Sequence, residues 1–507
     1  MEKRLILALA LSFVVLFGWS AFVGKPSQKA GISPVVRIAG QNNEPSLVSP
    51  ENPPPALKEE NIEFGQFEYQ NNNSKVIFSE PSATIKEITF NKYNNYKLSL
   101  KAGLSIGDPK WEFIRQSVGN NEVTYAYSDK EKTIVKRFIF DNTKYSTTLE
   151  INVQNKTKAN LSIQIPITLG VLNIAANAQL NPQDVIVSTK EKNFYPNIKR
   201  AKTFNNLKFI GLREKYFCAI IQPLDMDYSG GLVKINPNET EVRVLSSVYQ
   251  IASGQTIDLK FNAFLGPQDL KIIGSNNKDW QAIIYYGTFD VIAQVMLKML
   301  EFLFGLVHNW GWAIIILSFI IYIILYPLTL QQMRSMKVMQ AIQPQMEELK
   351  KQYKDNPQRL NKEMIELYRT NKVNPLGGCL PLILQIPIFF ALYQVLTRSI
   401  ALKGAHFLWI RDLAAPDRLF ILPNSLPLLG NEINILPLLM AGIMFFQQKS
   451  SMSKMGGAGA EQQKILLIIM PVMFGFLFYR MPSGLVLYWS INSVFTLIYQ
   501  LKTVKAK

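Results

Sequence analysis

Several long apolar runs in the second half of the chain constrain its fold most strongly. An α-helix needs about 20 apolar residues to cross a hydrocarbon core about 30 Å thick. Hydropathy identifies six runs: Leu5 to Val23, Gly311 to Leu330, Leu376 to Leu396, Ile435 to Gln447, Ile465 to Tyr479 and Leu485 to Leu501. The fourth and fifth are short, so we expect tilt or local thinning of the bilayer there. The sequence predicts a polytopic α-helical membrane protein with six spans.

Lys and Arg beside these runs predict the orientation of the chain. Lys3 and Arg4 precede the first run, basic residues are frequent in 331–373, and 502–507 contains three lysines. Positive charge is retained in the cytoplasm during insertion, so these segments and both termini are predicted to be cytoplasmic. The long segment after the first span then lies outside the cell membrane, which in a bacterium is the periplasm. Part of the net charge of +17 therefore reflects topology, and some can attract anionic lipid or ribosomal RNA rather than DNA.

The chain is predicted to divide into segments that alternate between membrane and solvent. They are an N-terminal transmembrane anchor (1–23), a Pro-rich linker (24–60), a periplasmic all-β sandwich (61–270), an interfacial amphipathic helix (280–309), a second span (310–330), a cytoplasmic helical hairpin (331–373), a third span (374–397), a periplasmic loop (398–432), a fourth span (433–448), a cytoplasmic loop (449–463), a fifth span (464–481), a sixth span (484–501) and a short basic cytoplasmic tail (502–507).

The N-terminal run is interpreted as an uncleaved anchor. A cleaved signal peptide is the alternative, because the run has a basic start and an apolar core. The run is longer than a usual signal core, and the following "SAFVGKPSQ" offers no small-x-small cleavage site. The next residues are rich in proline and poor in aromatics, which is typical of an extended linker.

Short alternating runs such as "TIVKRFIF" and "STTLEINVQ" fill the periplasmic segment. Apolar residues at every second position, separated by Asn, Gly, Pro and Asp, indicate antiparallel strands with one buried face. Both histidines, His308 and His406, fall outside this segment. No Asp or Glu there has a partner at catalytic spacing. A scaffold or docking surface is therefore favoured over a catalytic domain.

The two cysteines, Cys218 and Cys379, lie in segments placed in different regions. We expect two free, buried thiols, and no metal or cofactor.

Two helical patterns flank the second span. Residues 280–309 carry polar groups on one side and apolar groups on the rest, which predicts a helix in the outer interface; packing against the sandwich is the alternative. Residues 331–373 predict a hairpin with its turn at Lys354 to Pro357, where Asn356 caps the second helix and Pro357 starts it. Met346, Tyr353 and Met364 belong to its apolar stripe. That stripe is either the seam between the two helices or a surface that adapts to many apolar partner segments.

No Asp, Glu, Lys, Arg or His lies inside the five later spans, which argues against an ion pump or coupled transporter. The polar groups present are uncharged: Ser318, Tyr322, Thr329, Gln385, Tyr488 and Asn492 are among them. Such residues either form hydrogen bonds between helices or line a wet groove. Pro381 and Pro387 interrupt the third span, which would bend it and direct backbone toward a cavity.

Four sequences carry a family resemblance: "NWGWAIIILSFI", "KVNPLGGCLPLILQIPIFFALY", "FLWIRDL" and "PSGLVLYWSINSVFTLIYQ". They resemble the YidC branch of the YidC/Alb/Oxa membrane protein insertases, in order and with matching spacing, from about Lys208 to Leu501. "GLREKYFCAII" and "FNAFLGPQDL" are similar to strands of that branch's periplasmic domain.

The resemblance implies an insertase and chaperone, not an enzyme, that needs no cofactor. It would insert nascent inner-membrane proteins, alone or with the Sec translocon, through a hydrophilic groove open to lipid and cytoplasm. The ribosome, the signal recognition particle machinery and membrane lipids are further implied partners. A channel or transporter with a periplasmic sensory domain is the alternative. A third hypothesis, an enzyme acting on periplasmic sugars, has only fold likeness behind it.

The resemblance also implies site residues. Clients would contact Ser318, Tyr322, Thr329, Gln385, Tyr488, Trp489 and Asn492. The structural motif of the third span would comprise Asn374, Pro375, Gly377, Gly378, Pro381 and Pro387. One departure matters, because Tyr322 occupies the position where the family usually has a positive groove residue. Attraction of acidic client tails by a fixed charge is therefore not expected here.

Overall fold

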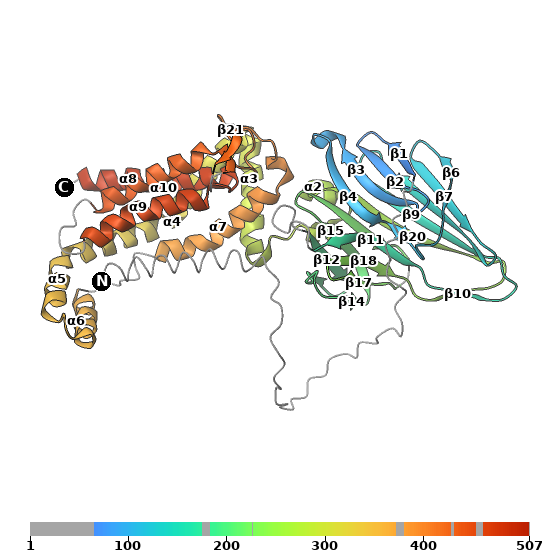
Figure 1. Ribbon diagram of the computed structural model, residues 1–507, viewed down its shortest axis with the longest axis horizontal. Coiled ribbons are helices and arrows are strands. Elements are labelled where there is room, and N and C mark those ends of the chain that lie inside the picture. The colour runs from blue at the N-terminus through green and yellow to red at the C-terminus, as the bar shows by residue number, and fades with distance from the viewer. Residues whose placement is uncertain are drawn as a thin grey trace, which may run out of the picture.

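The computed structural model describes residues 65–174, 183–225, 227–371, 380–426, 430–452 and 460–505. They form a β-sandwich and a helical bundle that lie end to end (Figure 1). Outside the described residues lie the predicted anchor (1–23), the linker (24–60), Cys379, and the first part of the span-three motif, Asn374, Pro375, Gly377 and Gly378.

The sandwich consists of two antiparallel sheets with mixed strand order. The first sheet runs β1-β2-β3-β4-β11-β18-β17-β14, with β5 beside β11, and the second runs β13-β12-β15-β16-β20-β9-β8-β7-β6. The strands of the first sheet are β1 (Gln66–Gln70), β2 (Ser74–Ser79), β3 (Thr84–Phe90), β4 (Tyr96–Gly103), β5 (Ser105–Ile106), β11 (Pro166–Asn173), β14 (Lys202–Phe204), β17 (Ser229–Asn236) and β18 (Glu239–Leu245). The strands of the second are β6 (Ile114–Val118), β7 (Glu122–Ser128), β8 (Lys132–Phe140), β9 (Ser146–Asn155), β12 (Asp184–Thr189), β13 (Asn193–Phe194), β15 (Leu207–Arg213), β16 (Phe217–Pro223) and β20 (Thr256–Pro267). A separate pair joins β10 (Leu161–Ile163) to β19 (Tyr249–Ile251).

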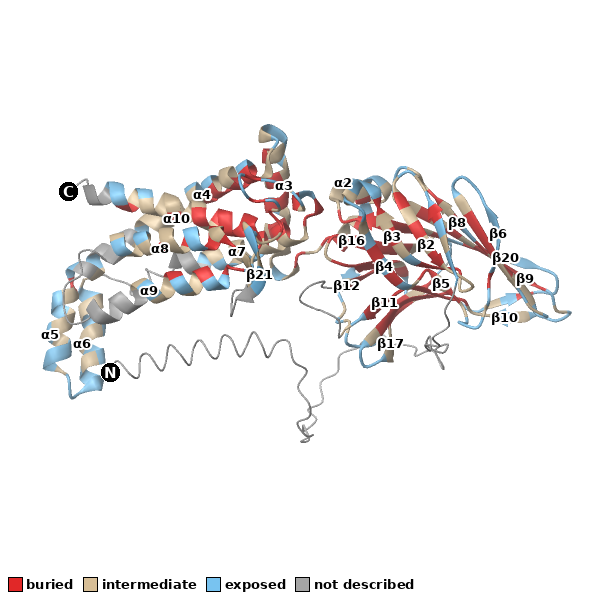
Figure 2. Cartoon of the chain, turned by 45° about the horizontal axis from the view of Figure 1, so that its top comes forward, coloured by how far each residue is buried: buried red, intermediate tan, exposed pale blue. Residues whose placement is uncertain are grey.

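Alternating side chains build the sandwich core, as the sequence predicts. Along β9 every second residue from Thr147 to Asn155 is buried, and those between them are partly or fully exposed. The buried faces of the two sheets meet in an aromatic cluster, where the Phe78 ring lies 5.1 Å from Phe138 and 5.7 Å from Tyr125. Figure 2 shows this buried layer between the sheets.

A second core joins the outer face of the second sheet to the first helical segments. Cys218 and Ile220 of β16 are buried there with Trp280 and Ile283. Trp280 and Ile283 belong to η2 (Lys278–Ile283), a short element between α2 (Leu270–Asn276) and η3 (Gly287–Phe289). Cys218 is a free, buried thiol, and burial raises its pKa, so it is inert filler as predicted.

The boundary predicted for the amphipathic helix, 280–309, was wrong at its start. The helix, α3, spans Asp290–Val307. Trp280 packs toward the sandwich, which requires a short 3-10 turn, and Gly287 then takes a positive φ of +83° that a helix cannot accommodate. The alternative, packing against the sandwich, is therefore observed for η2, whereas α3 packs against α4 and α7.

The bundle contains α4 (Trp310–Ala341), α7 (Leu380–Arg398), α8 (Ile435–Met452), α9 (Ala460–Leu477) and α10 (Ser483–Lys505). By length and apolar composition, the described residues contain two helices able to cross a membrane, Trp310–Gln332 and Ser483–Lys502, and a shorter apolar helix, Leu467–Leu477. The loop after α7 contains η5 (Ile400–Leu402) and a hairpin of β21 (Phe420–Leu426) and β22 (Gly430–Ile433).

The predicted 331–373 hairpin differs from expectation in its first arm. Helix α4 continues to Ala341, and a break at Ile342 separates it from α5 (Gln343–Gln352), because Pro344 falls in the first turn of α5. The second arm is α6 (Pro357–Thr370), and the side chain of Asn356 accepts the backbone N–H of Arg359. The predicted cap is therefore confirmed.

An ionic contact links the sandwich to the bundle. Asp184 of β12 accepts hydrogen bonds from Arg213 at 2.9 Å and from Arg398, at the end of α7, at 3.2 Å. Arg213 also donates to the carbonyl of Ile283 at 2.9 Å. Because one carboxylate holds two arginines from separate parts of the chain, Asp184 fixes the sandwich against the end of α7.

A fully buried lysine ties two turns of the sandwich together. Lys136 Nζ donates to the carbonyls of Ala83 at 2.7 Å and Leu104 at 2.6 Å. Both acceptors are non-glycine residues with positive φ, +49° and +53°, which costs energy that must be offset locally. Burial lowers the pKa of Lys136 well below its ordinary value, and a neutral amine still supplies both hydrogen bonds.

Replacing Lys136 with Met should destabilise the sandwich by about 2 kcal/mol, because two buried carbonyls lose their donor. The change should also alter the pH dependence. The folded pKa is lowered, so the native chain gains stability as pH rises from that pKa toward the unfolded value near 10.5, by at most about 1.4 kcal/mol per pH unit. Thermal unfolding of both proteins in detergent at several alkaline pH values measures this. Parallel pH profiles would contradict the assignment.

Candidate functional site

The polar residues predicted to line a groove come from three helices that contact one another. Ser318, Tyr322 and Thr329 lie on α4, Gln385 on α7, and Tyr488, Trp489 and Asn492 on α10. Pairwise contacts join α4 to α7, α4 to α10 and α7 to α10. The structure therefore brings the predicted residues onto neighbouring helices, although not all of them meet.

One direct side-chain bond connects α7 to α10 in this set. Gln385 Nε2 donates to the hydroxyl of Tyr488, which is fully buried. One turn further along α10, Asn492 Nδ2 donates to the carbonyl of Tyr488 at 3.0 Å. We call Gln385, Tyr488, Asn492 and Tyr322 the polar seam.

The hydroxyls on these helices bond mainly within their own helix. Ser318 Oγ donates to the carbonyl of Ile314 at 2.7 Å, and Thr329 Oγ1 donates to that of Leu325 at 3.2 Å. Such bonds satisfy the hydroxyl hydrogen without a partner on another helix. Ser318 is fully buried, so it lies inside the packed bundle, whereas Thr329 is half-buried.

Tyr322 lies in a row of aromatic rings between α4 and α10. Its ring is 5.3 Å from Phe495 and 6.0 Å from Tyr326. Tyr326 in turn makes an edge contact with Tyr499 at 5.6 Å. At the position where the resemblance implies a charge, the structure therefore has a half-buried phenol with aromatic neighbours.

Trp489 lies apart from the polar seam. Its ring lies 5.7 Å from Phe389 of α7, 5.6 Å from Phe474 of α9 and 5.3 Å from Phe478, which directly follows α9. Adjacent side chains on a helix point about 100° apart, so Tyr488 and Trp489 contact different residues. Trp489 joins α7, α9 and α10 through an aromatic cluster.

Burial divides the bundle into a packed end near the sandwich and a looser end near the hairpin (Figure 2). On α4, no described side chain after Ile321 is buried. On α7, the buried side chains among those described begin at Ala391, six residues after Gln385. Tyr322 and Gln385 therefore lie just beyond the packed section, where side chains are half-buried or exposed.

Prolines inside three helices leave carbonyls without their usual helical donor. Pro327 in α4, Pro387 in α7 and Pro471 in α9 each lack an N–H. The carbonyls of Ile323, Ile383 and Leu467 thus lose the bond from four residues on. Pro381 lies in the first turn of α7, where Pro is tolerated.

Hydrogen bonds that cap the starts of α8 and α10, at the packed end of the bundle, were not predicted from the sequence. Asp417, almost fully buried, accepts the N–H groups of Ile435 and Leu436 and so caps α8. The N–H groups of Ser483 and Gly484, which start α10, donate to the carbonyls of Ala415 and Leu413. Of these groups only Leu413 belongs to the quoted "FLWIRDL"; Ala415 and Asp417 follow it, and the N–H groups that they accept are distant in sequence.

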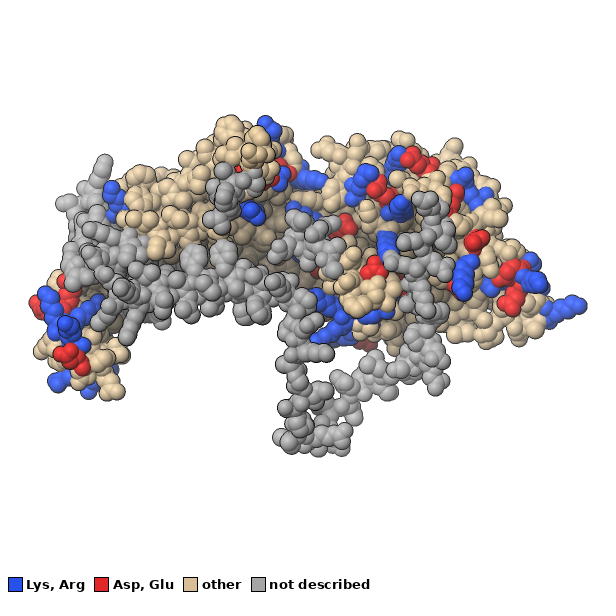
Figure 3. Space-filling model, in the orientation of Figure 1, with Lys and Arg blue, Asp and Glu red and all other residues tan. Residues whose placement is uncertain are grey.

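The α5–α6 hairpin lies at the far end of the bundle from the sandwich (Figure 1). Tyr353 lies under the guanidinium of Arg359 at 5.1 Å, and the Tyr368 hydroxyl contacts Met346 Sδ at 4.0 Å. Met364 is half-buried, and Pro357 occupies the first turn of α6. Neither helix contains a buried residue, and charged groups of both signs cover it (Figure 3).

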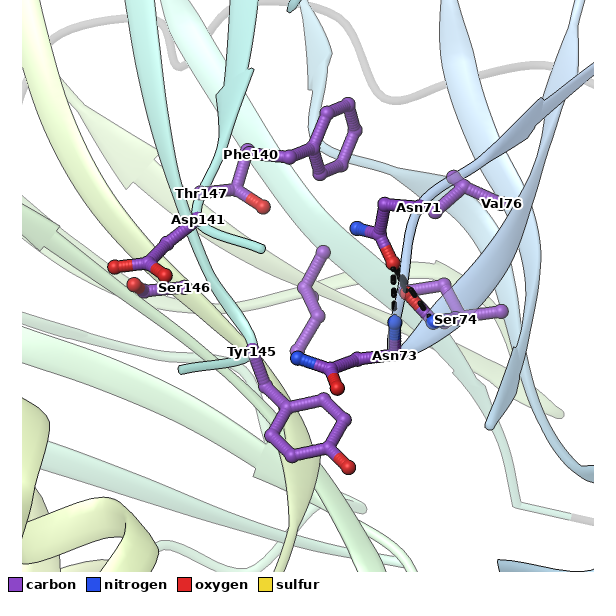
Figure 4. Close-up of a pocket in the computed structure, with 11 residues that line it drawn as sticks. Asn71, Asn73, Ser74, Val76, Phe140, Asp141, Tyr145, Ser146 and Thr147 are labelled. Atoms are coloured by element: carbon purple, nitrogen blue, oxygen red, sulfur yellow. Dashed lines mark hydrogen bonds between the residues drawn. The ribbon is translucent and has the colours of Figure 1, made fainter. Parts of the chain in front are cut away.

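Among the described residues, neither a metal-ligand cluster nor the pocket on the sandwich provides a second candidate site. Those residues contain no group of three or more His, Cys, Asp or Glu that could hold a metal ion. The pocket in Figure 4 lies on the sandwich between the β1–β2 turn and the start of β9. There, Asn71 Oδ1 accepts the backbone N–H groups of Asn73 at 3.0 Å and Ser74 at 2.7 Å. These bonds close a turn, so the pocket's polar groups have a structural role.

Comparison with known proteins covers both halves of the chain. The family described as 60Kd inner membrane protein matches residues 302–507, and the YidC periplasmic domain matches residues 71–299. A membrane protein insertase YidC from Pelobacter propionicus is 32% identical, over 99% of this chain and 98% of the relative. One from Geotalea uraniireducens is 30% identical over the same shares.

The chain belongs to the YidC family of membrane protein insertases. A crystal structure of an active YidC insertase with its first transmembrane domain resolved is 21% identical, covers 87% of this chain and 93% of that chain, and has a TM-score of 0.41. A crystal structure of YidC from Thermotoga maritima is 16% identical, covers 87% and 98%, and has a TM-score of 0.33.

Both halves of the chain match parts of the same family. The YidC periplasmic domain corresponds to the β-sandwich, and the insertase core corresponds to the helical half. The inference drawn from the quoted sequences is therefore confirmed at the level of the family. The transporter alternative loses its support, since both halves match the YidC family.

The Gln385–Tyr488 bond can be tested with a double-mutant cycle. Gln385→Leu and Tyr488→Phe should each destabilise the protein, and the double variant should be more stable than the sum predicts, with a coupling of about 1 kcal/mol. Thermal unfolding of the full chain in detergent measures each variant. Strict additivity of the two changes would show that the bond contributes nothing.

Proposed function

We propose that this YidC-family chain inserts nascent inner-membrane proteins through the looser half of its bundle, along the polar seam. The observation that carries the proposal is the uneven burial of α4 and α7. Ser318 and Ile321 are packed, whereas Tyr322 and Gln385 are partly accessible. A bundle closed near the sandwich and open near the hairpin offers a polar tail an entry from the hairpin side only.

The energetics of insertion fit such a half-open groove. Burying Leu, Ile, Phe or Val in a bilayer releases about 0.3–0.6 kcal/mol per residue, so an apolar segment of roughly 20 residues inserts downhill. The main barrier is dehydration of the client's polar tail. Amides and phenols at the seam, with the carbonyls freed by Pro327 and Pro387, supply partners that lower this barrier.

The proposed topology has six spans with both termini in the cytoplasm and the sandwich in the periplasm. Helices α4 and α10 have the length and composition of spans. We assign α7, α8, α9 and the N-terminal run to the others by their apolar sequences. The α5–α6 hairpin then faces the cytoplasm, which suits its charged surface (Figure 3).

The exposed apolar side of α3 fits the proposed position in the outer interface. Val291, Val295, Phe302 and Leu306 are exposed, while the opposite side packs on α4 and α7. Lipid would cover the exposed side.

The proposed partners follow from the same arrangement. Nascent inner-membrane proteins are the clients, and the Sec translocon, the ribosome and the signal recognition particle machinery deliver them. The hairpin is the proposed surface for the cytoplasmic partners, because it combines charge with the half-buried Met346 and Met364.

Site-specific photocrosslinking to a single-span client tests the groove. Crosslinkers at Tyr322 and Gln385 should capture the client in vesicles that contain only this protein, and the client should become protected from protease. A crosslinker at Ile324, which is exposed on the same helix, is the matched control for contact through lipid. Equal capture at Ile324 and the seam, or protection without seam adducts, would reject this route. Solute uptake without client protection would instead indicate a transporter.

Tyr322→Arg should improve insertion of clients with acidic tails and leave uncharged apolar clients unchanged. The added guanidinium would lie among Tyr326 and Phe495 and attract a carboxylate by about 1 kcal/mol, a several-fold gain. Tyr322→Phe is the uncharged control. Insertion of paired clients differing only in tail charge measures the effect, and no gain for the acidic tail would contradict it.

A further inference from the structure

The loop between α7 and α8 presents large apolar side chains outward from the packed end of the bundle. Leu408 is 74% exposed, Ile421 is 65% exposed and Phe420 is 59% exposed, and Trp409 is also exposed. We call these four residues the apolar tip. Two come from the turn at 407–410 and two from the start of β21.

The turn that carries Leu408 is held firmly. Phe407 and Ile410 exchange two backbone hydrogen bonds, at 2.9 and 2.8 Å. The Phe407 ring is buried against Gly311 at the start of α4, where a Cβ would lie 2.0 Å from Cγ of Phe407. Leu408 has a φ of +52°, an unfavourable conformation for leucine. The fold thus maintains backbone strain that directs a leucine outward, which indicates a function.

The rest of the apolar tip is fixed to the same end of the bundle. Trp409 Nε1 lies 3.4 Å from Oδ2 of Asp417, the residue that caps α8. The indole thus combines a bonded N–H with an exposed ring, the arrangement typical of tryptophan at a membrane surface. Arg418 pairs with Glu432 across the β21–β22 hairpin at 2.9 Å.

Two observations identify lipid as the partner. The start of helix α8 is capped by Asp417, which also contacts Trp409 of the apolar tip, and Leu438 and Leu439 near the start of this helix are exposed as well. Arg411 follows the turn at 407–410, and the Arg480 guanidinium lies near Gly430 at the start of β22; both are exposed and form no salt bridge with any described residue. Apolar groups bordered by unpaired arginines match the boundary between acyl chains and anionic headgroups.

We propose that the apolar tip inserts into the leaflet on the sandwich side and anchors the packed end of the bundle there. This rests on the proposed topology, but not on the route that clients take. The anchored loop also supplies the carbonyls that cap α10 and the carboxylate that caps α8. Lipid contact at the apolar tip therefore fixes the depth of both helices.

Spin labels on two isoleucines of similar exposure test the proposal. Ile421→Cys probes the apolar tip, and Ile114→Cys, 69% exposed on the edge strand β6 of the sandwich, is the matched control. Both go into the full chain with Cys218→Ala and Cys379→Ser, reconstituted in vesicles of phosphatidylethanolamine and phosphatidylglycerol. At position 421 oxygen should relax the label several-fold more than a water-soluble nickel chelate, and at 114 the order should reverse.

Two outcomes at position 421 overturn the proposal. Preference for the nickel chelate would place the apolar tip in water, and shielding from both reagents would indicate a protein partner. Replacing phosphatidylglycerol with phosphatidylcholine should move the label outward, and Arg411→Gln with Arg480→Gln should remove this dependence. A depth independent of lipid charge would overturn the role given to the arginines. Client insertion by the same vesicles reports separately on the proposed function.

Discussion

Inside a bilayer every backbone N–H and C=O must find its partner within the protein, and the helical half of this chain is organised by that requirement. Two helices begin against the 398–434 loop, where Asp417 caps α8 and the carbonyls of Leu413 and Ala415 cap α10. Ser318 and Thr329 turn their hydroxyls back to their own helices. Pro327, Pro387 and Pro471 each remove one helical N–H donor, so the carbonyls four residues before them add polar groups within these helices.

These carbonyls belong to the half of the bundle that is less tightly packed, where we propose a groove without a fixed charge. A fixed cation would attract an acidic tail but would cost several kcal/mol to keep in the membrane. Tyr322 and Gln385 avoid that cost, because a phenol and an amide can bond to water, to a client or to each other's helices with small differences in energy. The proposed groove would therefore favour no client charge, which would suit a protein that handles many sequences.

Features that depend on local periodicity can be predicted from the sequence. Features that depend on contacts between residues far apart in the chain cannot. Alternation along β9 and helical spacing along α6, with its Asn356 cap, depend on neighbouring residues, and both are present in the structure. The buried role of Lys136 could not be predicted, because the two carbonyls that accept its hydrogen bonds are 53 and 32 residues away in the sequence. The start of α3 was placed ten residues early, since packing of Trp280 on the sandwich overrides local helical preference. The resemblance grouped Trp489 with Tyr488, and the structure gives the two residues different neighbours, because adjacent residues on a helix face different directions.

Tight packing at the end of the bundle near the sandwich offsets the stability that is lost where the end near the α5–α6 hairpin packs less tightly. A bundle that stays partly open has fewer buried contacts, so its stability must come from elsewhere. Here the packed section from Ala391 to Leu396, the caps at Asp417, and the Arg213–Asp184–Arg398 contact all lie toward the sandwich. The sandwich adds its own core, which includes Ile400 from the loop after α7. Opening the hairpin end to water and clients then disturbs few of the interactions that hold the fold.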